Sequence, residues 1–254
     1  NKELLPALHA LDVDPRTNLP NPAASPKQRI IGRIMTAVER VRVDDEANLR
    51  DILDRVHEIS IDHIDDQHFF TLSQVYEDLL LKMGEKNSDG GQFFTPREVI
   101  RAMVHTVNPS LGKTVYDPCC GTGGFLAVAY EHIERKLGKT PASTDIEKLK
   151  HDTFFGREKE NLVFPIALAN LVLHGIDQPN LWHGNSLTRK ATYAELFRHA
   201  PAQFDVILTN PPFGGMEADG IENNFPRKYQ TRETADLFMA LIMHLLKHDT
   251  GKAA

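Results

Sequence analysis

The sequence predicts an α/β fold in which a parallel sheet follows a small helical domain. Short apolar runs that read as strands begin only after residue 110, and the first leads through a glycine-rich turn into a helix. These runs are residues 114–117, 153–158, 181–184 and 204–208. We therefore predict a helical domain at residues 1–85 and an α/β domain at residues 86–254.

Helical periodicity predicts the structure of the first domain. Ser25-Pro26-Lys27-Gln28 has the pattern of a helix cap, and an apolar stripe of helical spacing follows it. Two more stripes predict a second and a third helix, whereas residues 15–26 and 83–91 are expected to be irregular. In chain order the stripes comprise Ile30, Ile31, Ile34, Met35, Val38 and Val41; Leu49, Ile52, Leu53 and Val56; and Leu72, Val75, Tyr76, Leu79 and Leu80.

Composition limits the classes of function. The chain has 254 residues, 41% of them hydrophobic, which is ample for a core, and no run reaches membrane-spanning length. The two cysteines are adjacent, at positions 119 and 120, which excludes a disulfide framework and favours a reducing cytoplasm. A formal net charge of −6 does not suit a protein that grips nucleic acid alone. The spacing of His57, His63 and His68 matches no standard metal site, so no metal is predicted.

A helix is predicted to begin just before the first strand. Thr95-Pro96-Arg97-Glu98 reads as a capping box with proline at the first helical position. Val99, Ile100, Met103 and Val104 then continue an apolar stripe. A well-capped helix end of this kind is also a rigid place to bind a carboxylate.

The glycine-rich turn after the first strand spans Asp117-Pro118-Cys119-Cys120-Gly121-Thr122-Gly123-Gly124. Glycines there let the backbone approach a ligand closely, and the helix that follows favours anionic groups at its N-terminus. A dinucleotide fingerprint needs a further glycine where Leu126 stands, and the Gly-Lys-Ser/Thr of a phosphate-binding loop is absent. Asp117 at the strand end instead suits a ligand that carries an ammonium group.

The second and third strands also end in polar residues. Glu158 closes the second strand, where a carboxylate can accept both hydroxyl groups of a ribose. Asn185 follows the third strand and is suited to hydrogen-bond an adenine edge. Ligands of open α/β sheets bind beyond the carboxyl ends of the strands, so these side chains predict a site for an adenosine that carries an amino acid.

The fourth strand runs into Asn210-Pro211-Pro212-Phe213. Two consecutive prolines fix φ and remove two backbone donors, so the turn is stiff and its carbonyl groups lack strand partners. Asn210 adds an acceptor and Phe213 a flat apolar face. Acceptors beside an aromatic ring suit a planar group with an NH2, either the exocyclic amine of a base or a side-chain amide.

A polar stretch, residues 214–232, follows this turn and is long for a connection. We expect it either to fold over the bound base or contact phosphates, or to be disordered. Residues 235–246 then predict an apolar helix, and residues 251–254 lie where a further strand is expected to begin. The lack of an initiator methionine suggests a fragment.

These motifs, in this order, resemble those of S-adenosylmethionine-dependent DNA adenine-N6 methyltransferases. The closer resemblance is to the modification (M) subunit of type I restriction–modification systems. It rests on Gly91-Gln92-Phe93-Phe94-Thr95-Pro96-Arg97, on the glycine-rich turn, on Asn-Pro-Pro-Phe-Gly-Gly and on Asn224-Phe225-Pro226, and it spans roughly residues 70 to 254. Asn185 departs from the pattern, because many members of the family have Asp there.

The resemblance implies a Rossmann-like methyltransferase sheet whose C-terminal strands are missing from the sequence, with S-adenosyl-L-methionine as the cofactor. Asn210, Pro211, Pro212 and Phe213 would be catalytic. The residues expected to bind the cofactor are Gln92, Phe93, Phe94, Thr95, Pro96, Arg97, Asp117, Gly121, Thr122, Gly123, Gly124, Glu158 and Asn185.

The implied partners are duplex DNA with a flipped adenine, a specificity (S) subunit, a second M subunit and, in the full complex, a restriction (R) subunit. No membrane association is expected. Two alternatives stay open: a protein glutamine or RNA methyltransferase that uses the same Asn-Pro-Pro-Phe turn, and a non-catalytic nucleotide-binding scaffold.

Overall fold

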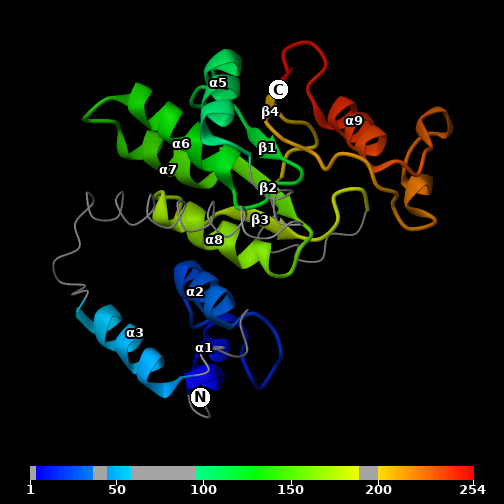
Figure 1. The fold of residues 1–254 in the computed structure, drawn as a ribbon. Helices are drawn as coiled ribbons and strands as arrows, with labels where there is room; N and C mark the ends of the chain where they lie inside the picture. Colours follow the sequence, from blue (N-terminus) through cyan, green and yellow to red (C-terminus); the bar gives the residue numbers. More distant parts are fainter. Residues whose placement is uncertain (1–3, 37–44, 59–94, 189–199) are drawn as a thin grey trace. The chain divides into compact units, whose positions relative to one another are not determined.

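The computed structural model describes residues 4–36, 45–58, 95–188 and 200–254 (Figure 1). The chain divides into two compact units, residues 1–78 and 79–254. The predicted domain boundary at residues 85 and 86 lies outside the described ranges, so it stays a prediction. No helix in those ranges is both long and apolar enough to cross a membrane.

The first unit is helical in its described residues, with α1 (Leu4–Asp12), α2 (Pro26–Thr36) and α3 (Glu46–Glu58). The predicted cap of α2 is confirmed, because the Gln28 amide donates to Ser25 Oγ and the Ser25 amide donates to Gln28 Oε1. Helices α1 and α2 pack closely at Gly32, where a Cβ would lie 2.7 Å from the Leu8 carbonyl oxygen. The third predicted helix lies outside the described residues.

The helix predicted from the apolar stripe of α2 is confirmed, but the stripe is only partly buried. Ile30 is buried at 3% exposure, but Ile31 and Met35 are 39% and 53% exposed. Ile31 and Met35 stand four residues apart and share one side of the helix, whereas Gly32 faces α1. Ile52 of α3 is likewise 48% exposed. Helix α1 is an addition to the predicted set.

The second unit contains five parallel strands in the order β3-β2-β1-β4-β5. They are β1 (Val115–Asp117), β2 (Phe154–Glu158), β3 (Asn180–His183), β4 (Val206–Ile207) and β5 (Lys252–Ala253). The predicted α/β class is therefore confirmed, and β5 lies where a further strand was expected. The strand order reverses between β1 and β4, which makes their carboxyl ends the switch point where open α/β sheets bind ligands.

Helices cover both faces of this sheet (Figure 1). On one face lie α5, α6 and α8, and α6 contacts both β1 and β2. On the other face Tyr116, Phe155 and Ile207 form a core with Ile242 and Leu245 of α9. The helices are α5 (Arg97–Val107), α6 (Gly124–Leu137), α7 (Ser143–His151), α8 (Val163–Leu173) and α9 (Thr234–Leu245).

Gly156 of β2 allows α6 to approach the sheet. A Cβ at this position would lie 2.6 Å from Leu181 Cδ2 and 2.9 Å from Leu126 Cδ1, so no larger residue fits without displacement. The neighbouring Phe154 and Phe155 point to opposite faces, as alternation along a strand requires.

The capping box predicted at residues 95–98 is wrong. Helix α5 begins at Arg97, one residue later than expected, and Pro96 occupies the N-cap position without a side-chain hydrogen bond. The Thr95 hydroxyl is used elsewhere, because it accepts a hydrogen bond from Asn210 Nδ2 at 3.1 Å. A tertiary contact has therefore replaced the local one.

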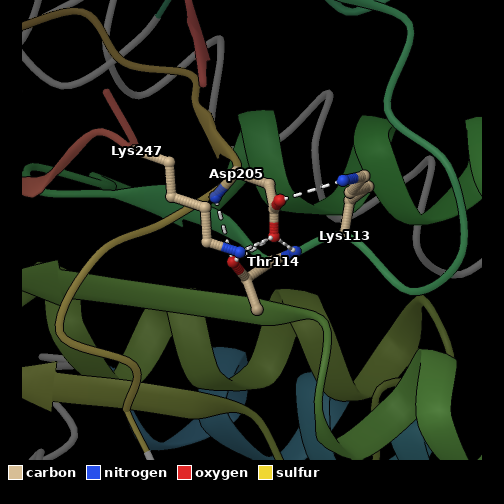
Figure 2. Close-up of polar contacts among 4 residues, drawn as sticks. All are labelled: Lys113, Thr114, Asp205 and Lys247. Atoms are coloured by element: carbon tan, nitrogen blue, oxygen red, sulfur yellow. Dashed lines mark hydrogen bonds and ion pairs between the residues drawn. The ribbon is translucent and has the colours of Figure 1, made fainter. Parts of the chain in front are cut away.

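The amino ends of β1 and β4 are joined through Asp205 (Figure 2). Its carboxylate accepts from the Thr114 amide and hydroxyl, both at 3.0 Å. Lys113 Nζ lies 3.1 Å and Lys247 Nζ 2.9 Å from the same carboxylate. Burial alone would raise the pKa of Asp205, but these donors and the two ammonium groups outweigh it and lower the pKa. The cluster therefore stabilises the edge of the sheet opposite the switch point.

We expect Asp205→Asn to lower the free energy of unfolding by about 1.5–3 kcal/mol, because it removes charge-assisted hydrogen bonds from a buried network. The folded-state pKa lies below the unfolded value, so this contribution is present above about pH 4 and is lost as the pH falls further. Urea denaturation of both proteins from pH 3 to 7 measures it. A difference that grew on acidification would contradict this assignment.

Candidate active site

The carboxyl ends of β1 and β4 meet at the switch point, and a hydrogen-bond network joins them. Thr209 Oγ1 donates to Asp117 Oδ1 at 2.7 Å and lies 3.0 Å from Cys119 Sγ. The Cys119 amide donates to the same Asp117 oxygen at 3.2 Å. The glycine-rich turn and the Asn-Pro-Pro-Phe turn are thus held in register by residues at the two strand ends.

Asp117 is the most deeply buried acid of the site, at 1% exposure. Its second oxygen, Oδ2, is buried and has no hydrogen-bond partner among the described residues. Burial raises the pKa of Asp117 to about 7, a shift that the bonds from Thr209 and Cys119 oppose and nearby Glu158 reinforces. A buried carboxylate oxygen without a partner is costly, and a cationic donor would satisfy it.

Glycines shape the turn that follows. Gly121 and Gly123 have φ values of 54° and 82°, in the left-handed region that favours glycine. The Gly121 amide donates to Glu158 Oε2 at 2.8 Å, which ties the turn to the end of β2. From α8, Asn170 Nδ2 donates to the Thr122 carbonyl at 2.8 Å. Helix α6 begins at Gly124, so its N-terminus opens onto the carboxyl edge of the sheet.

Glu158 is buried at 6% exposure, and its other oxygen, Oε1, accepts from the Glu160 amide at 2.7 Å. Burial raises the pKa of this carboxyl, although the amides of Glu160, Gly121 and Lys159 oppose the shift. Each oxygen of a carboxylate can accept a second hydrogen bond. Glu158 therefore keeps the capacity to accept hydroxyl groups.

The turn after β4 presents Asn210 and Phe213 differently. Asn210 is half-buried, and its Nδ2 is held by Thr95 Oγ1 at 3.1 Å, which leaves the side-chain oxygen to accept from a ligand. Phe213 is 86% exposed, which is unusual for a large apolar ring. The stiff turn therefore places an oriented acceptor close in sequence to an exposed aromatic face.

Asn185 is more constrained than the sequence suggests. Its Oδ1 accepts from the Leu187 amide at 2.9 Å, and its Nδ2 donates to Glu217 Oε2 at 2.9 Å. Contact with an adenine edge would use the remaining amide hydrogen or the second lone pair of Oδ1.

Several predicted residues are not brought to this network. Arg97 Nη2 lies 3.2 Å from Glu131 Oε1 of α6, so its guanidinium is engaged in an ion pair. Gln92, Phe93 and Phe94 lie outside the described residues, and Pro96 carries no side-chain donor.

Burial raises the pKa of both cysteine thiols, which fits small neutral side chains in a tight turn.

Sequence reasoning missed Thr209 and Glu217 as parts of the site, and it placed Cys119 in the turn without predicting its contact with Thr209. Thr209 immediately precedes Asn210, and a hydroxyl next to a ligand turn is a signal that a reader of the sequence can use. Glu217 carries no such signal, because its contact with Asn185 joins residues 32 positions apart.

A parallel sheet with acids and an Asn-Pro-Pro-Phe turn at its carboxyl edge places the second unit among the open α/β folds, which bind ligands at that edge. Within that class the chain belongs to the N-6 DNA methylase family, whose model matches residues 67–254. The resemblance inferred from the motifs is thereby confirmed.

Individual relatives agree with the family. The methylase subunit of the type I restriction enzyme EcoEI from Escherichia coli is 41% identical over 207 residues, 81% of this chain and 40% of the relative. The EcoKI methylase subunit of Escherichia coli K12 is 32% identical over 189 residues, covering 71% of this chain and 34% of the relative.

Solved structures share the fold. A chain assigned as a modification subunit of a type I restriction enzyme from Vibrio vulnificus YJ016 superposes with a TM-score of 0.76 at 37% identity. That match covers 98% of this chain and 49% of the other. The sequence thus spans less than half the length of each of these relatives.

Proposed function

We propose that this chain is part of a DNA methyltransferase that transfers a methyl group from S-adenosyl-L-methionine to N6 of adenine in duplex DNA. It would act as the M subunit of a type I restriction–modification complex. The observation that carries the proposal is the Thr209–Asp117 hydrogen bond, at 2.7 Å, which couples a cofactor-type turn to the Asn-Pro-Pro-Phe turn. Membership of the N-6 DNA methylase family supports the same reaction.

The residues present fit the cofactor. Asp117 Oδ2 is a buried acceptor without a partner among the described residues, which suits the ammonium of the methionine part. Glu158 would accept the ribose hydroxyl groups, and Asn185 would contact the adenine. Gly121, Thr122, Gly123 and Gly124 would bring the backbone of the turn close to the cofactor, and residues 92–97 would contact its methionine end.

When bound, the cofactor supplies an electrophilic methyl group on a sulfonium. The protein's part is to orient the nucleophile. The Asn210 side-chain oxygen and the Pro211 carbonyl would accept the N6 hydrogens of adenine, and Pro212 would hold the turn rigid. These bonds strengthen as positive charge develops on nitrogen, so they favour the transition state over the ground state.

Access to such a site requires the adenine to leave the duplex. Extrusion costs a few kcal/mol, and stacking on the exposed Phe213 ring would return roughly 1–3 kcal/mol of it. Because Phe213 is 86% exposed, its face is free to receive a base.

Most of the DNA binding is assigned to other subunits of the complex. The chain carries a formal net charge of −6, which opposes phosphate binding. Its relatives are methylase subunits of type I restriction enzymes. We propose that a specificity subunit reads the target, that two M chains embrace the duplex and that a restriction subunit joins the full complex.

The free thiols at Cys119 and Cys120 suit a reducing cytoplasm.

One experiment tests this proposal against the alternatives. The full-length M chain is incubated with radiolabelled cofactor and a mixture of duplex DNA, RNA and protein, with and without the specificity subunit, and the labelled product is identified. We expect N6-methyladenine at one sequence only when the specificity subunit is present, and weak, unselective DNA binding by the M chain alone. Label on protein glutamine or RNA would establish the first alternative. Cofactor binding without any transfer would establish a scaffold.

A further inference from the structure

The loop that follows the Asn-Pro-Pro-Phe turn is ordered by contacts with the rest of the second unit. Residues 214–232 contain two 3-10 turns, η4 (Ile221–Asn224) and η5 (Arg227–Tyr229). Ile221 and Phe225 pack against a core of Leu187, Leu237 and Phe238. Disorder, one of the two expectations for this loop, is therefore wrong.

The beginning of the loop is fixed separately, at Glu217. Its amide donates to the Arg232 carbonyl at 2.9 Å, next to a β-bridge between Met216 and Glu233. Its carboxylate accepts from Thr234 Oγ1 at 3.3 Å, at the start of α9. The other carboxylate oxygen accepts from Asn185 Nδ2 at 2.9 Å, beyond the end of β3. Glu217 thus connects three segments through one half-buried side chain.

The contact between Glu217 and Asn185 joins the proposed cofactor side of the site to its proposed base side. Asn185 belongs to the cofactor side of the site, whereas Glu217 lies seven positions after Asn210 on the base side. Asn185 keeps a second restraint, since its Oδ1 accepts from the Leu187 amide at 2.9 Å. Loss of the Glu217 carboxylate would therefore leave Asn185 in place and loosen the start of the loop, which would keep its backbone bond to Arg232.

We propose that Glu217 is a positioning residue that couples the base-holding turn to the cofactor side of the site through Asn185. This inference rests on the proposed function for its kinetic part and on the loop geometry alone for its structural part. Asn185 stands where many adenine methyltransferases carry Asp. The amide of Asn185 donates to Glu217 at 2.9 Å, whereas a carboxylate at position 185 would repel that of Glu217.

The test compares four variants with the parent chain. Glu217→Ala removes the contacts with Asn185 and Thr234, and Asn185→Asp sets two carboxylates against each other. The double variant Asn185→Asp/Glu217→Gln restores an amide–carboxylate bond with the roles exchanged. Asp219→Asn is the matched control, since Asp219 pairs with Arg232 in the same loop but its side chain is 85% exposed. An exposed pair of this kind contributes little.

Hydrogen–deuterium exchange of residues 214–232, in the full-length chain without DNA or cofactor, gives a readout that needs no turnover. We expect Glu217→Ala and Asn185→Asp to speed exchange at the start of the loop about tenfold or more, as the loss of a charge-assisted bond requires. The double variant should return to near parental rates, and the control should not differ from the parent. Parental protection in Glu217→Ala, or no recovery in the double variant, would overturn the inference.

Kinetics of the reconstituted complex then separate positioning from cofactor binding. For Glu217→Ala we expect kcat/KM for DNA to fall about tenfold or more while the Kd for the cofactor stays within about threefold, because Asn185 keeps its second restraint. An equal loss in both quantities would make Glu217 a cofactor ligand and reject the coupling role. If the parental complex does not methylate adenine, the proposed function fails, and the exchange experiment still decides the role of Glu217 in the loop.

Discussion

Replacing Asn210 by alanine is expected to slow methyl transfer about a hundredfold or more, by analogy with the loss of one preorganised group that stabilises transition-state charge. Cofactor affinity should change little, because we assign cofactor binding to Asp117 and Glu158 rather than to Asn210. The physical reason is that Asn210 Nδ2 is held by Thr95 at 3.1 Å, so the side-chain oxygen is oriented before the base arrives. Single-turnover kinetics with saturating DNA measure the loss.

Thr95 offers a matched control for this prediction. Thr95→Val removes the hydroxyl that accepts from Asn210 and should produce a smaller loss, whereas Thr95→Ser keeps the hydroxyl and should retain most of the rate. Calorimetry should show the cofactor still bound by the Asn210 variant. Lost cofactor binding with normal turnover at high cofactor would reverse the roles that we assign to the two turns.

The second large effect is the pH dependence of cofactor affinity. Burial raises the pKa of Asp117 to about 7, so below that pH a cationic ligand must displace a proton from the carboxyl. Affinity should therefore rise as the pH increases towards 7. It should fall again above about pH 8, where the ligand's own α-amino group loses its proton.

Asp117→Asn should abolish the acidic limb of this profile and weaken binding at pH 7.5 about 10- to 150-fold, the equivalent of about 1.5–3 kcal/mol. Calorimetry from pH 5 to 9 measures both. 5′-Methylthioadenosine, which lacks the amino acid part, is the matched control ligand. Its affinity should not fall as the pH drops below 7. A pH-independent affinity of the parent chain for S-adenosylmethionine would refute our assignment of Asp117 to the ammonium group.

The parts of the structure that sequence predicts are those set by local pattern. Glu158 at the end of β2 and the strand leading to Asn210 follow from apolar runs that stop at polar residues, and the structure has both. The cap at Ser25 is likewise local, because both of its hydrogen bonds are made with Gln28, three residues away.

The parts that sequence does not predict depend on tertiary contacts. The sequence pattern predicts a local bond from the Thr95 hydroxyl to α5, but the hydroxyl instead contacts Asn210, 115 positions away. Ile31 belongs to the apolar stripe of α2 and is nevertheless 39% exposed, whereas Gly32 on another side of the helix meets α1. The Glu217–Asn185 contact depends on the path of a long loop, which no periodicity encodes.

Asp117 and Asp205 lie near opposite ends of the neighbouring strands β1 and β4, and protons act on them in opposite senses. The folded protein binds the proton of Asp205 more weakly than the unfolded chain does, and that of Asp117 more tightly. Ionised Asp205 therefore stabilises the fold, whereas ionisation of Asp117 destabilises it as the pH rises from about 4 to about 7. At neutral pH a cationic ligand would therefore act as the counter-ion of Asp117. Binding would stabilise the fold at the carboxyl edge of the sheet, where the negative charge of Asp117 destabilises it.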